Sequence, residues 1–147
     1  FEKFSIKDLY DHLNANSISS LLVIRRIIPG MKKRKWGRIV NTSSIGTKFG
    51  GGLKNFAYSL SKFNNEFFPG YFRNVYSKNV IINSLQIGFT ETKMLKKLQT
   101  KDYKKRVKLI PLNRTAKPIE VANYIFYLCN DENKLLTGSV INISGGE

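Results

Sequence analysis

The sequence predicts an α/β fold in which helices cover a parallel β-sheet. Three short apolar stretches have the character of strands, at residues 37–42, 79–85 and 138–143. Segments with apolar residues at helical spacing separate them, and strands that alternate with helices are typical of a parallel sheet. The chain has 147 residues, 41% of them hydrophobic, which is enough for one domain with its own core. A three-stranded sheet is narrow, so we expect one unprotected edge.

The first helix is expected over residues 6–28. Ser5 stands at the N-cap position, and Asp8 follows three residues later, near the positive end of the helix dipole. Polar residues within 16–20 interrupt the apolar stripe, which indicates either a close-packing contact or a site. The Pro-Gly pair at 29–30 is expected to end or kink this helix. The stripe consists of Leu9, Leu13, Leu21, Ile24 and Ile28.

The later helices alternate with the strands. One is expected over residues 56–76, with a kink or break at the Pro-Gly pair 69–70. The second strand is almost continuously apolar, as expected of a strand covered on both faces, and residues 86–92 form the loop that leaves it. A polar helix is expected over 93–109, and another helix begins at Pro118.

The charge balance is strongly basic, because 25 Lys and Arg against 10 Asp and Glu give a formal charge of +15. Such a surplus is found in proteins that bind nucleic acid or another anionic partner. The basic residues are spread over the whole chain, however, and the aromatic residues stand at core spacing. We therefore favour solvated basic faces and do not expect a nucleic-acid partner, while a basic nucleic-acid-binding domain stays open as an alternative.

Several other kinds of site and location are not indicated. No stretch reaches the roughly 18 apolar residues of a membrane span, and we find no signal peptide. The single cysteine, Cys129, lies in an apolar run and is expected to be a buried thiol, which suits a reducing cytoplasm. The single histidine, His12, has no Cys or His companion, so we expect no metal site.

Tyr58 and Lys62 are the first candidates for chemistry. Residues four apart on a helix share a face, with about 5–6 Å between their Cβ atoms. At that distance an ammonium lowers the pKa of a phenol, since a positive charge favours the phenolate. A phenol brought towards neutrality can give a proton to a carbonyl oxygen or take one from an alcohol. The same spacing also occurs in any exposed pair on a helix, so the surroundings of the pair decide.

Ser43 and Ser44 stand at the end of the first strand, ahead of that pair. A serine hydroxyl aimed at the same substrate oxygen would orient it and stabilise its developing charge. The glycines at 50–52 lack the following Lys and Ser or Thr of a phosphate-binding loop, so we do not assign them that role.

Taken in order, these motifs resemble those of the short-chain dehydrogenase/reductase family, most of all its 3-ketoacyl-carrier-protein-reductase-like members. Each motif alone is common, but all of them in order at compatible spacing form a specific pattern. The resemblance runs the full length of the chain and covers only the C-terminal portion of the family's Rossmann-type doubly wound parallel sheet. The motifs are the helix asparagine within 14–17, the strand into the serines at 37–44, the Tyr-x-x-x-Lys motif at 58–62, Gly88 with Thr92, and the last strand with its glycines at 137–146.

The resemblance implies roles for four residues in carbonyl reduction or alcohol oxidation. Tyr58 would give or take the proton, while Lys62 would lower the pKa of that phenol and hold the ribose hydroxyls of the nicotinamide cofactor. Ser44 would orient the substrate carbonyl, with Ser43 as the second choice. Asn16 would hold a water that links Lys62 to solvent as a proton relay, and the alternative for Asn16 is a buried amide bonded to neighbouring backbone.

The resemblance also implies cofactor contacts from Gly88, Thr90 and Thr92, in the loop over the nicotinamide. At Ile87 the family has a proline instead. The glycine-rich phosphate turn and the ribose-reading residue belong to the first βα unit of a dinucleotide fold, and the sequence has neither. We therefore expect residues 1–147 to be the C-terminal portion of a single domain, with about a hundred residues missing on its N-terminal side. Alone it should bind cofactor poorly and be inactive, and NAD and NADP stay equal alternatives.

Eight basic residues crowd the segment after this loop. In the family this region is a mobile lid over the substrate. The hypothesis is that the lid favours an anionic substrate, such as a nucleotide-linked or acidic sugar, or an acyl group on an acidic carrier protein. The alternative is a solvated helix face. The eight are Lys93, Lys96, Lys97, Lys101, Lys104, Lys105, Arg106 and Lys108.

The leading interpretation is therefore an NAD(P)-dependent oxidoreductase that acts on a small-molecule carbonyl or alcohol. A non-catalytic relative that keeps the fold for interaction only is a further alternative, beside the nucleic-acid-binding domain. Family members commonly pair through the helices that correspond to 6–28 and 56–76, so the resemblance implies a homo-oligomer, either a dimer or a tetramer. We expect a cytoplasmic protein with no membrane contact.

Overall fold

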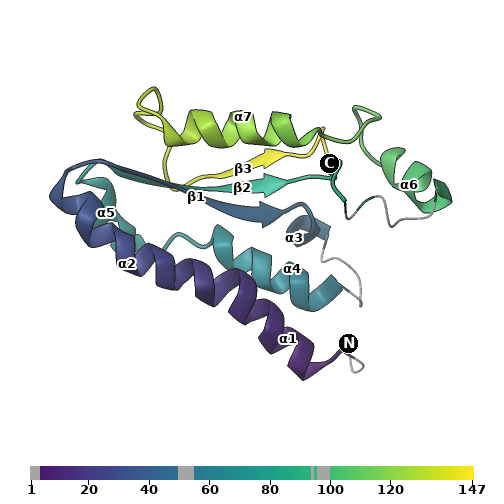
Figure 1. Ribbon diagram of the computed structural model, residues 1–147, viewed down its shortest axis with the longest axis horizontal. Helices are drawn as coiled ribbons and strands as arrows, with labels where there is room; N and C mark the ends of the chain where they lie inside the picture. The colour runs from purple at the N-terminus through teal and green to yellow at the C-terminus, as the bar shows by residue number, and fades with distance from the viewer. Residues whose placement is uncertain (1–3, 50–54, 94, 96–99) are drawn as a thin grey trace.

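A sheet of three parallel strands forms the centre of the molecule (Figure 1). The computed structural model describes residues 4–49, 55–93, 95 and 100–147. The strands are β1 (Gly37–Ser44), β2 (Val80–Ile87) and β3 (Val140–Ile143), in the order β1-β2-β3. The predicted α/β fold with a parallel sheet is thus confirmed. Among the described residues β1 and β3 each pair on one side only, so both are edge strands.

Helices cover both faces of this sheet. The α-helices of the described residues are α1 (Ile6–His12), α2 (Ser19–Lys33), α3 (Gly46–Phe49), α4 (Phe56–Phe63), α5 (Arg73–Tyr76), α6 (Thr100–Val107) and α7 (Pro118–Cys129). In Figure 1, α7 lies on one side of the sheet, and α2, α4 and α5 lie on the other. α3 and α6 lie beyond the carboxyl ends of the strands, which is the end at which open parallel sheets bind ligands.

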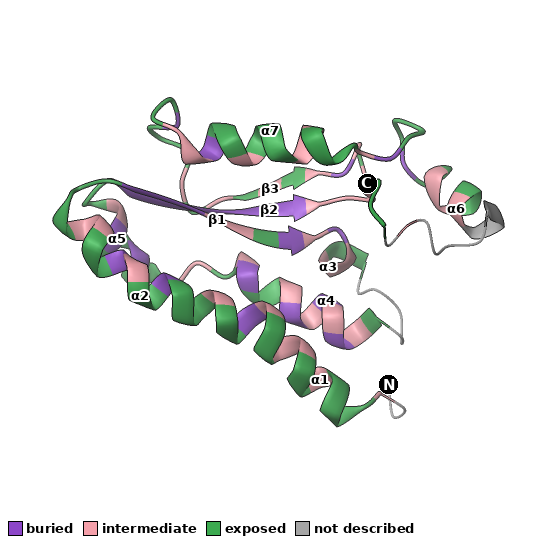
Figure 2. Cartoon of the chain, in the orientation of Figure 1, coloured by how far each residue is buried: buried purple, intermediate pink, exposed green. Residues whose placement is uncertain are grey.

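Strand β2 is buried along nearly its whole length (Figure 2). Val80, Ile82 and Leu85 are fully enclosed, because β1 and β3 flank the strand and helices cover its two faces. This confirms the expectation from its continuous apolar run. The main apolar cluster, which lies between the sheet, α2 and α5, consists of Ile24, Ile28, Ile39, Phe72, Val75, Val80 and Ile82.

The first helical run is longer than predicted and contains a π-helical segment. α1 continues through η1 (Leu13–Ile18) into α2, so the run ends at Lys33 rather than near residue 28. The polar interruption in the apolar stripe falls in η1. There the buried Ser17 donates a hydrogen bond from its hydroxyl to the carbonyl oxygen of Ser61 on α4, at 2.7 Å. The interruption is therefore a close contact between helices, and π segments of this kind are frequent at functional sites.

An end or a kink was predicted for this helix at the Pro-Gly pair, and the end is wrong. Pro29 lies inside α2, and the helix ends four residues later in a left-handed cap. Lys35 has a φ of 52°, and the Trp36 N–H donates to the Met31 carbonyl at 3.2 Å. Together with the bond from the Lys35 N–H to the Lys32 carbonyl, also 3.2 Å, these are the bonds of a Schellman motif. This cap, and not the proline, sets the length of the helix.

The second predicted helix is broken, as expected, at its own Pro-Gly pair. α4 passes into the 3₁₀ turn η3 (Asn64–Glu66), and residues 67–69, of which Phe67 and Pro69 are extended, separate it from η4 (Gly70–Phe72) and α5. Pro69 disfavours a helical conformation for the residue before it, which explains the break. The polar helix predicted over 93–109 is represented by α6, while residues 94 and 96–99 lie outside the described residues.

Two predicted helix starts are confirmed. The Ser5 hydroxyl accepts a hydrogen bond from the Asp8 N–H at 3.2 Å, and Pro118 occupies the first turn of α7.

At the other end of α7, Cys129 is half-buried rather than fully buried, and its partial burial raises the pKa of the thiol.

The described residues were compared with the requirements of a membrane span and of a metal site. Within them, no helix is both long enough and apolar enough to cross a membrane. Nor do three His, Cys, Asp or Glu side chains come together there as a metal ion would require.

We predict that Leu85→Ala destabilises the protein by about 2–5 kcal/mol, because it leaves a cavity between strand β2 and the elements that cover it. Leu85 is 0% exposed, whereas Leu135 is 90% exposed and provides the same substitution as a control. Leu135→Ala should change the free energy of unfolding by less than about 0.5 kcal/mol. Urea-induced unfolding measures both, and equal effects would contradict the burial of β2.

Candidate active site

A cleft of about 400 Å³ opens at the carboxyl ends of β1 and β2. Six of the seven residues predicted for the site line it, and the seventh, Asn16, does not. The strands bring the residues together because β1 and β2 pair in parallel register, so that Ser44 lies opposite Ile87. The predicted residues in the cleft are Ser44, Tyr58, Lys62, Gly88, Thr90 and Thr92.

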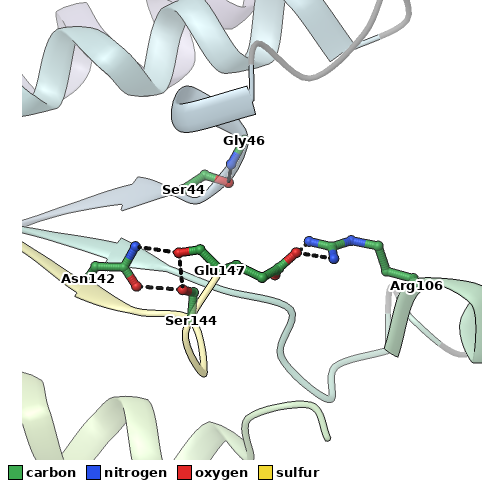
Figure 3. A network of polar contacts seen from close by, with 6 residues as sticks. All are labelled: Ser44, Gly46, Arg106, Asn142, Ser144 and Glu147. Atoms are coloured by element: carbon green, nitrogen blue, oxygen red, sulfur yellow. Dashed lines mark hydrogen bonds and ion pairs between the residues drawn. The ribbon is translucent and has the colours of Figure 1, made fainter. Parts of the chain in front are cut away.

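Ser44 is the last residue of β1, and its hydroxyl lies at the start of a tight turn (Figure 3). The Ser44 Oγ accepts a hydrogen bond from the Gly46 N–H at 3.2 Å, so its own proton is free to be donated elsewhere. Ser43 also lines the cleft but is only 3% exposed, and its hydroxyl donates to groups inside the protein, the Glu66 carboxylate and the Lys62 carbonyl. This geometry favours Ser44 over Ser43 as the residue that meets a substrate.

Tyr58 and Lys62 lie one turn apart on α4. The buried residues of α4 are small: Ala57 and Ser61 lie on one side of the helix, and Ser59 lies on the opposite side. The Tyr58 ring meets the ring of His12 from α1 edge-on, with 5.9 Å between the ring centroids. We did not predict this contact, because a lone histidine in a helix carries no signal of its tertiary neighbours.

The Lys62 side chain reaches from α4 back to strand β1. Its Nζ donates to the carbonyl oxygen of Thr42 at 3.1 Å and lies 3.4 Å from the Thr42 Oγ1. The side chain is half-buried, and this loss of water lowers the pKa of Lys62 below its usual value. A cation held in this way at the wall of the cleft is suited to attract a phenolate or the hydroxyls of a bound ligand.

Asn16 lies in the π segment η1 and does not line the cleft. Its Nδ2 donates to the Ser61 hydroxyl at 3.0 Å, beside Lys62 on α4. Its carbonyl oxygen accepts from the Asn65 side chain at 3.1 Å, and the same amide lies 3.3 Å from the Thr42 carbonyl that binds Lys62. Asn16 is thus connected to Lys62 through Asn65 and Thr42, and Asn65 is a residue that the sequence analysis missed.

Gly88 follows β2 and is constrained by packing as well as by any ligand. A Cβ atom at this position would lie 2.5 Å from the Ser144 Cα, so no side chain fits against β3. The Gly88 carbonyl accepts from the Thr90 hydroxyl at 3.0 Å, and Thr90 forms an isolated bridge with Ala116. Although Ile87 replaces the family's proline, it remains within β2 and pairs on both sides. The loop over the cleft is therefore held at several points.

The cleft fits the nicotinamide end of a dinucleotide cofactor. It offers the hydroxyls of Tyr58, Thr90 and Thr92 and the ammonium of Lys62, which are partners for the ribose hydroxyls and the carboxamide. The partly dehydrated ammonium of Lys62 gains when polar ligand atoms replace lost water. Among the described residues there is no glycine-rich turn for the pyrophosphate.

Comparison with known proteins decides the family. A family model described as enoyl-(acyl carrier protein) reductase matches residues 1–147. The 3-oxoacyl-[acyl-carrier-protein] reductase FabG of Aquifex aeolicus is 34% identical over 147 residues, which are 99% of this chain and 59% of that protein. The chain belongs to the short-chain dehydrogenase/reductase family. This membership confirms the resemblance and favours the oxidoreductase interpretation over the nucleic-acid-binding alternative.

Further members of this family match in sequence and in structure. Acetoacetyl-CoA reductase of Cupriavidus necator is 31% identical over 99% of this chain and 59% of that protein. The crystal structure of a 3-oxoacyl (acyl-carrier-protein) reductase from Agrobacterium tumefaciens C58, with NADP bound, superposes with a TM-score of 0.89 at 23% identity. The superposition covers 100% of this chain and 58% of the Agrobacterium chain, so the short-chain dehydrogenase/reductase fold extends over the whole chain. The chain spans 59% of the length of the two curated relatives.

We predict that stability depends on pH through Lys62 with a defined sign. Its pKa is lowered in the folded state and returns to about 10.5 on unfolding. Below the folded pKa, Lys62 is protonated in both the folded and the unfolded state, and burial of its charge lowers the free energy of unfolding by the full amount. Between the folded pKa and 10.5 the unfolded state binds more protons, so this cost is relieved as pH rises. The free energy of unfolding of the wild type should therefore rise with pH in this window relative to Lys62→Met.

Lys7 is a control with the opposite sign. Its hydrogen bond and charge pairing with Asp11 raise the pKa of Lys7 above 10.5. The stabilisation from this pair is present below 10.5 and is lost as pH rises through the folded pKa. Urea unfolding of wild type, Lys62→Met and Lys7→Met over this range measures both slopes. A flat difference for Lys62→Met would contradict its burial.

Proposed function

We propose that this chain is the substrate-binding, proton-transferring part of an NAD(P)-dependent oxidoreductase that reduces a carbonyl or oxidises an alcohol. The observation that supports the proposal is the shared cleft of Ser44, Tyr58 and Lys62 at the carboxyl ends of β1 and β2. The printed functions of the relatives agree with it, since they are named as reductases of 3-oxoacyl and acetoacetyl thioesters.

In the proposed reaction each side chain has a separate task. The Ser44 hydroxyl donates a hydrogen bond to the substrate carbonyl oxygen and opposes the build-up of negative charge there. The Tyr58 phenol gives its proton to that oxygen as the alcohol forms, and takes it back in the reverse direction. Lys62 stabilises the phenolate that remains and holds the ribose of the cofactor. The bound NAD or NADP supplies the hydride.

Asn16 is proposed to support proton return to the site. It lies outside the cleft, and its carbonyl oxygen connects to Lys62 through the Asn65 amide and the Thr42 carbonyl. A water bound near this carbonyl would link the ammonium to solvent. Gly88, Thr90 and Thr92 are proposed to face the nicotinamide, which is consistent with their places in the same cleft.

Residues 1–147 are proposed to be the C-terminal portion of one Rossmann-type domain, inactive without the rest. The chain spans 59% of the length of its curated relatives, and β1 and β3 are both edge strands in the described part. The apolar side chains Ile119 and Phe126 of α7 are exposed, and we propose that further helices of that domain cover them. A homo-oligomer is proposed on similar grounds, because Leu21, Leu22 and Val23 of α2 are exposed.

We predict that Tyr58→Phe lowers kcat of the complete enzyme by about 10²- to 10⁴-fold, because it removes the proton donor and keeps the ring. The variant should still bind cofactor. The assay follows oxidation of NADPH or NADH with acetoacetyl-CoA as the ketone, and cofactor binding is titrated separately by fluorescence. Tyr10→Phe, at an exposed tyrosine of α1, is the control and should keep full activity. An active Tyr58→Phe enzyme would refute the assigned role.

The substrate is proposed to be anionic, since exposed lysines follow Thr92 of the cleft in the sequence, at position 93 and on α6. Lys93, Lys104, Lys105 and Lys108 are exposed. Lys96 and Lys97 lie outside the described residues, as does the side chain of Lys101. Arg106 does not contribute a free charge, because it forms an ion pair with Glu147. The attraction would therefore come from the lysines alone.

We predict that reversing the charges of Lys104 and Lys105 to Glu raises KM for acetoacetyl-CoA on the order of tenfold at low salt, with little change in kcat. High salt should shrink the effect, since exposed charges are screened beyond about 10 Å at 0.1 M. The control is the same reversal at Lys32 and Lys33, at the far end of α2. A KM that does not move at low salt would end the idea of electrostatic selection.

A further inference from the structure

A carboxylate that the proposed reaction does not use, Glu66, is hydrogen-bonded to Ser43 at the wall of the cleft. Glu66 follows Lys62 by four residues and ends the turn η3 that continues α4. Its Oε1 accepts hydrogen bonds from three side chains. These are the Ser43 hydroxyl, the Thr47 hydroxyl at 2.8 Å and the Gln86 amide at 3.1 Å. One oxygen thus joins the continuation of α4 to β1, α3 and β2.

The groups bound by Glu66 stand on either side of Ser44. Ser43 precedes it, and the Thr47 Oγ1 lies 2.8 Å from the carbonyl oxygen of Ser44. Within this turn the Gly46 N–H donates to the Ser44 Oγ. The turn that orients the Ser44 hydroxyl is therefore attached at both ends to one side chain on the helical segment that carries Tyr58 and Lys62.

The charge of Glu66 strengthens the three hydrogen bonds that its oxygen accepts. None of the ion pairs among the described residues involves Glu66, and its three donors are all neutral. A neutral oxygen with two lone pairs would bind three donors weakly, whereas hydrogen bonds to a carboxylate are about twice as strong. An unpaired carboxylate in this place is consistent with a need to hold several hydroxyl and amide groups at once.

The same network continues from Gln86 across the sheet to α6, and Figure 3 shows its last part, from Asn142 to Arg106. The Gln86 Oε1 accepts from the Asn142 side chain at 2.9 Å, and the Asn142 Oδ1 accepts from the Ser144 hydroxyl at 2.5 Å. Ser144 and Asn142 also bond the Glu147 carbonyl, while the Glu147 side chain, 5% exposed, binds Arg106 of α6 through both oxygens. Gln86 is thus fixed from both sides, which makes Glu66 the end of a rigid chain of polar contacts.

We propose that Glu66 is a positioning residue that clamps the Ser44 turn to the helix of Tyr58 and Lys62, and so sets the distance between the hydroxyl and the phenol. For its effect on catalysis, this inference rests on the proposed function. Its structural part, the clamp, stands on the contacts alone and can be tested without any activity.

The kinetic test compares Glu66→Ala and Glu66→Gln in the complete enzyme, with acetoacetyl-CoA and NADPH or NADH. Glu66→Ala should lower kcat on the order of tenfold, since it removes a charged acceptor of three bonds. Glu66→Gln keeps one acceptor oxygen in the same shape and should fall between Ala and wild type. The KM for the cofactor should not change. Asp131→Asn, which loses the charge that accepts from the Trp36 ring N–H at the other end of β1, is the control and should leave kcat unchanged.

A double-mutant cycle separates positioning from a general structural role. If Glu66 acts through Ser44, then Glu66→Ala should cost little more once Ser44→Ala is present, so the two effects should not add. Additive losses in kcat would mean that Glu66 does not act through Ser44, and would overturn the proposal.

Hydrogen exchange tests the clamp without relying on activity. In Glu66→Ala the amides of residues 44–48 should exchange faster, while those of the β2–β3 pair should keep the wild-type rate. Unchanged exchange in the turn, or equal loosening of the whole sheet, would overturn the clamp. A wild-type enzyme without reductase activity would instead refute the proposed function, and the exchange result would still decide the clamp.

Discussion

The in-register parallel pairing of β1 with β2 is the constraint on which the site depends. It brings Ser44 beside Ile87, and it places the turn after β1 and the loop after β2 at one edge of the sheet. β2 is enclosed on both faces, and a slip of one residue would move each of its side chains to the opposite buried face, where the packing is different. The helix α4 then needs only to lie across this edge to bring Tyr58 and Lys62 to Ser44.

Local patterns allowed much of this arrangement to be predicted. The continuous apolar run of β2 and the alternation of strands with helices indicated a parallel sheet, and the four-residue spacing placed Tyr58 and Lys62 on one face. These signals depend on neighbours in sequence. The predicted helix end at Pro29 is wrong, because the helix continues past the proline and ends in a cap at Lys35. A lysine has no marked preference for φ above zero, so its sequence position did not indicate the cap.

The contacts that complete the site depend on residues far apart in sequence. Glu66 gave no signal, since an acidic residue at the end of a helix is ordinary, and its donors come from positions 20 or so residues away. His12 and Asn65 meet Tyr58 and Thr42 only after the helices have packed. Arg106 was counted among the free charges of the lid, but Glu147 neutralises it, and no local pattern distinguishes a paired arginine from a solvated one.

The partial burial of Lys62 lowers the stability of the folded protein at one point of the cleft. Partial burial disfavours its charged form, which the lowered pKa records, and an apolar side chain in its place would avoid this cost. The structure offsets part of it with the Thr42 carbonyl, but that oxygen is shared with the Asn65 amide and cannot replace a full shell of water. A cation kept under-solvated one helical turn from a phenol is suited to bind an anion or a polyol. Such a loss of stability is common where activity requires a strained or desolvated group.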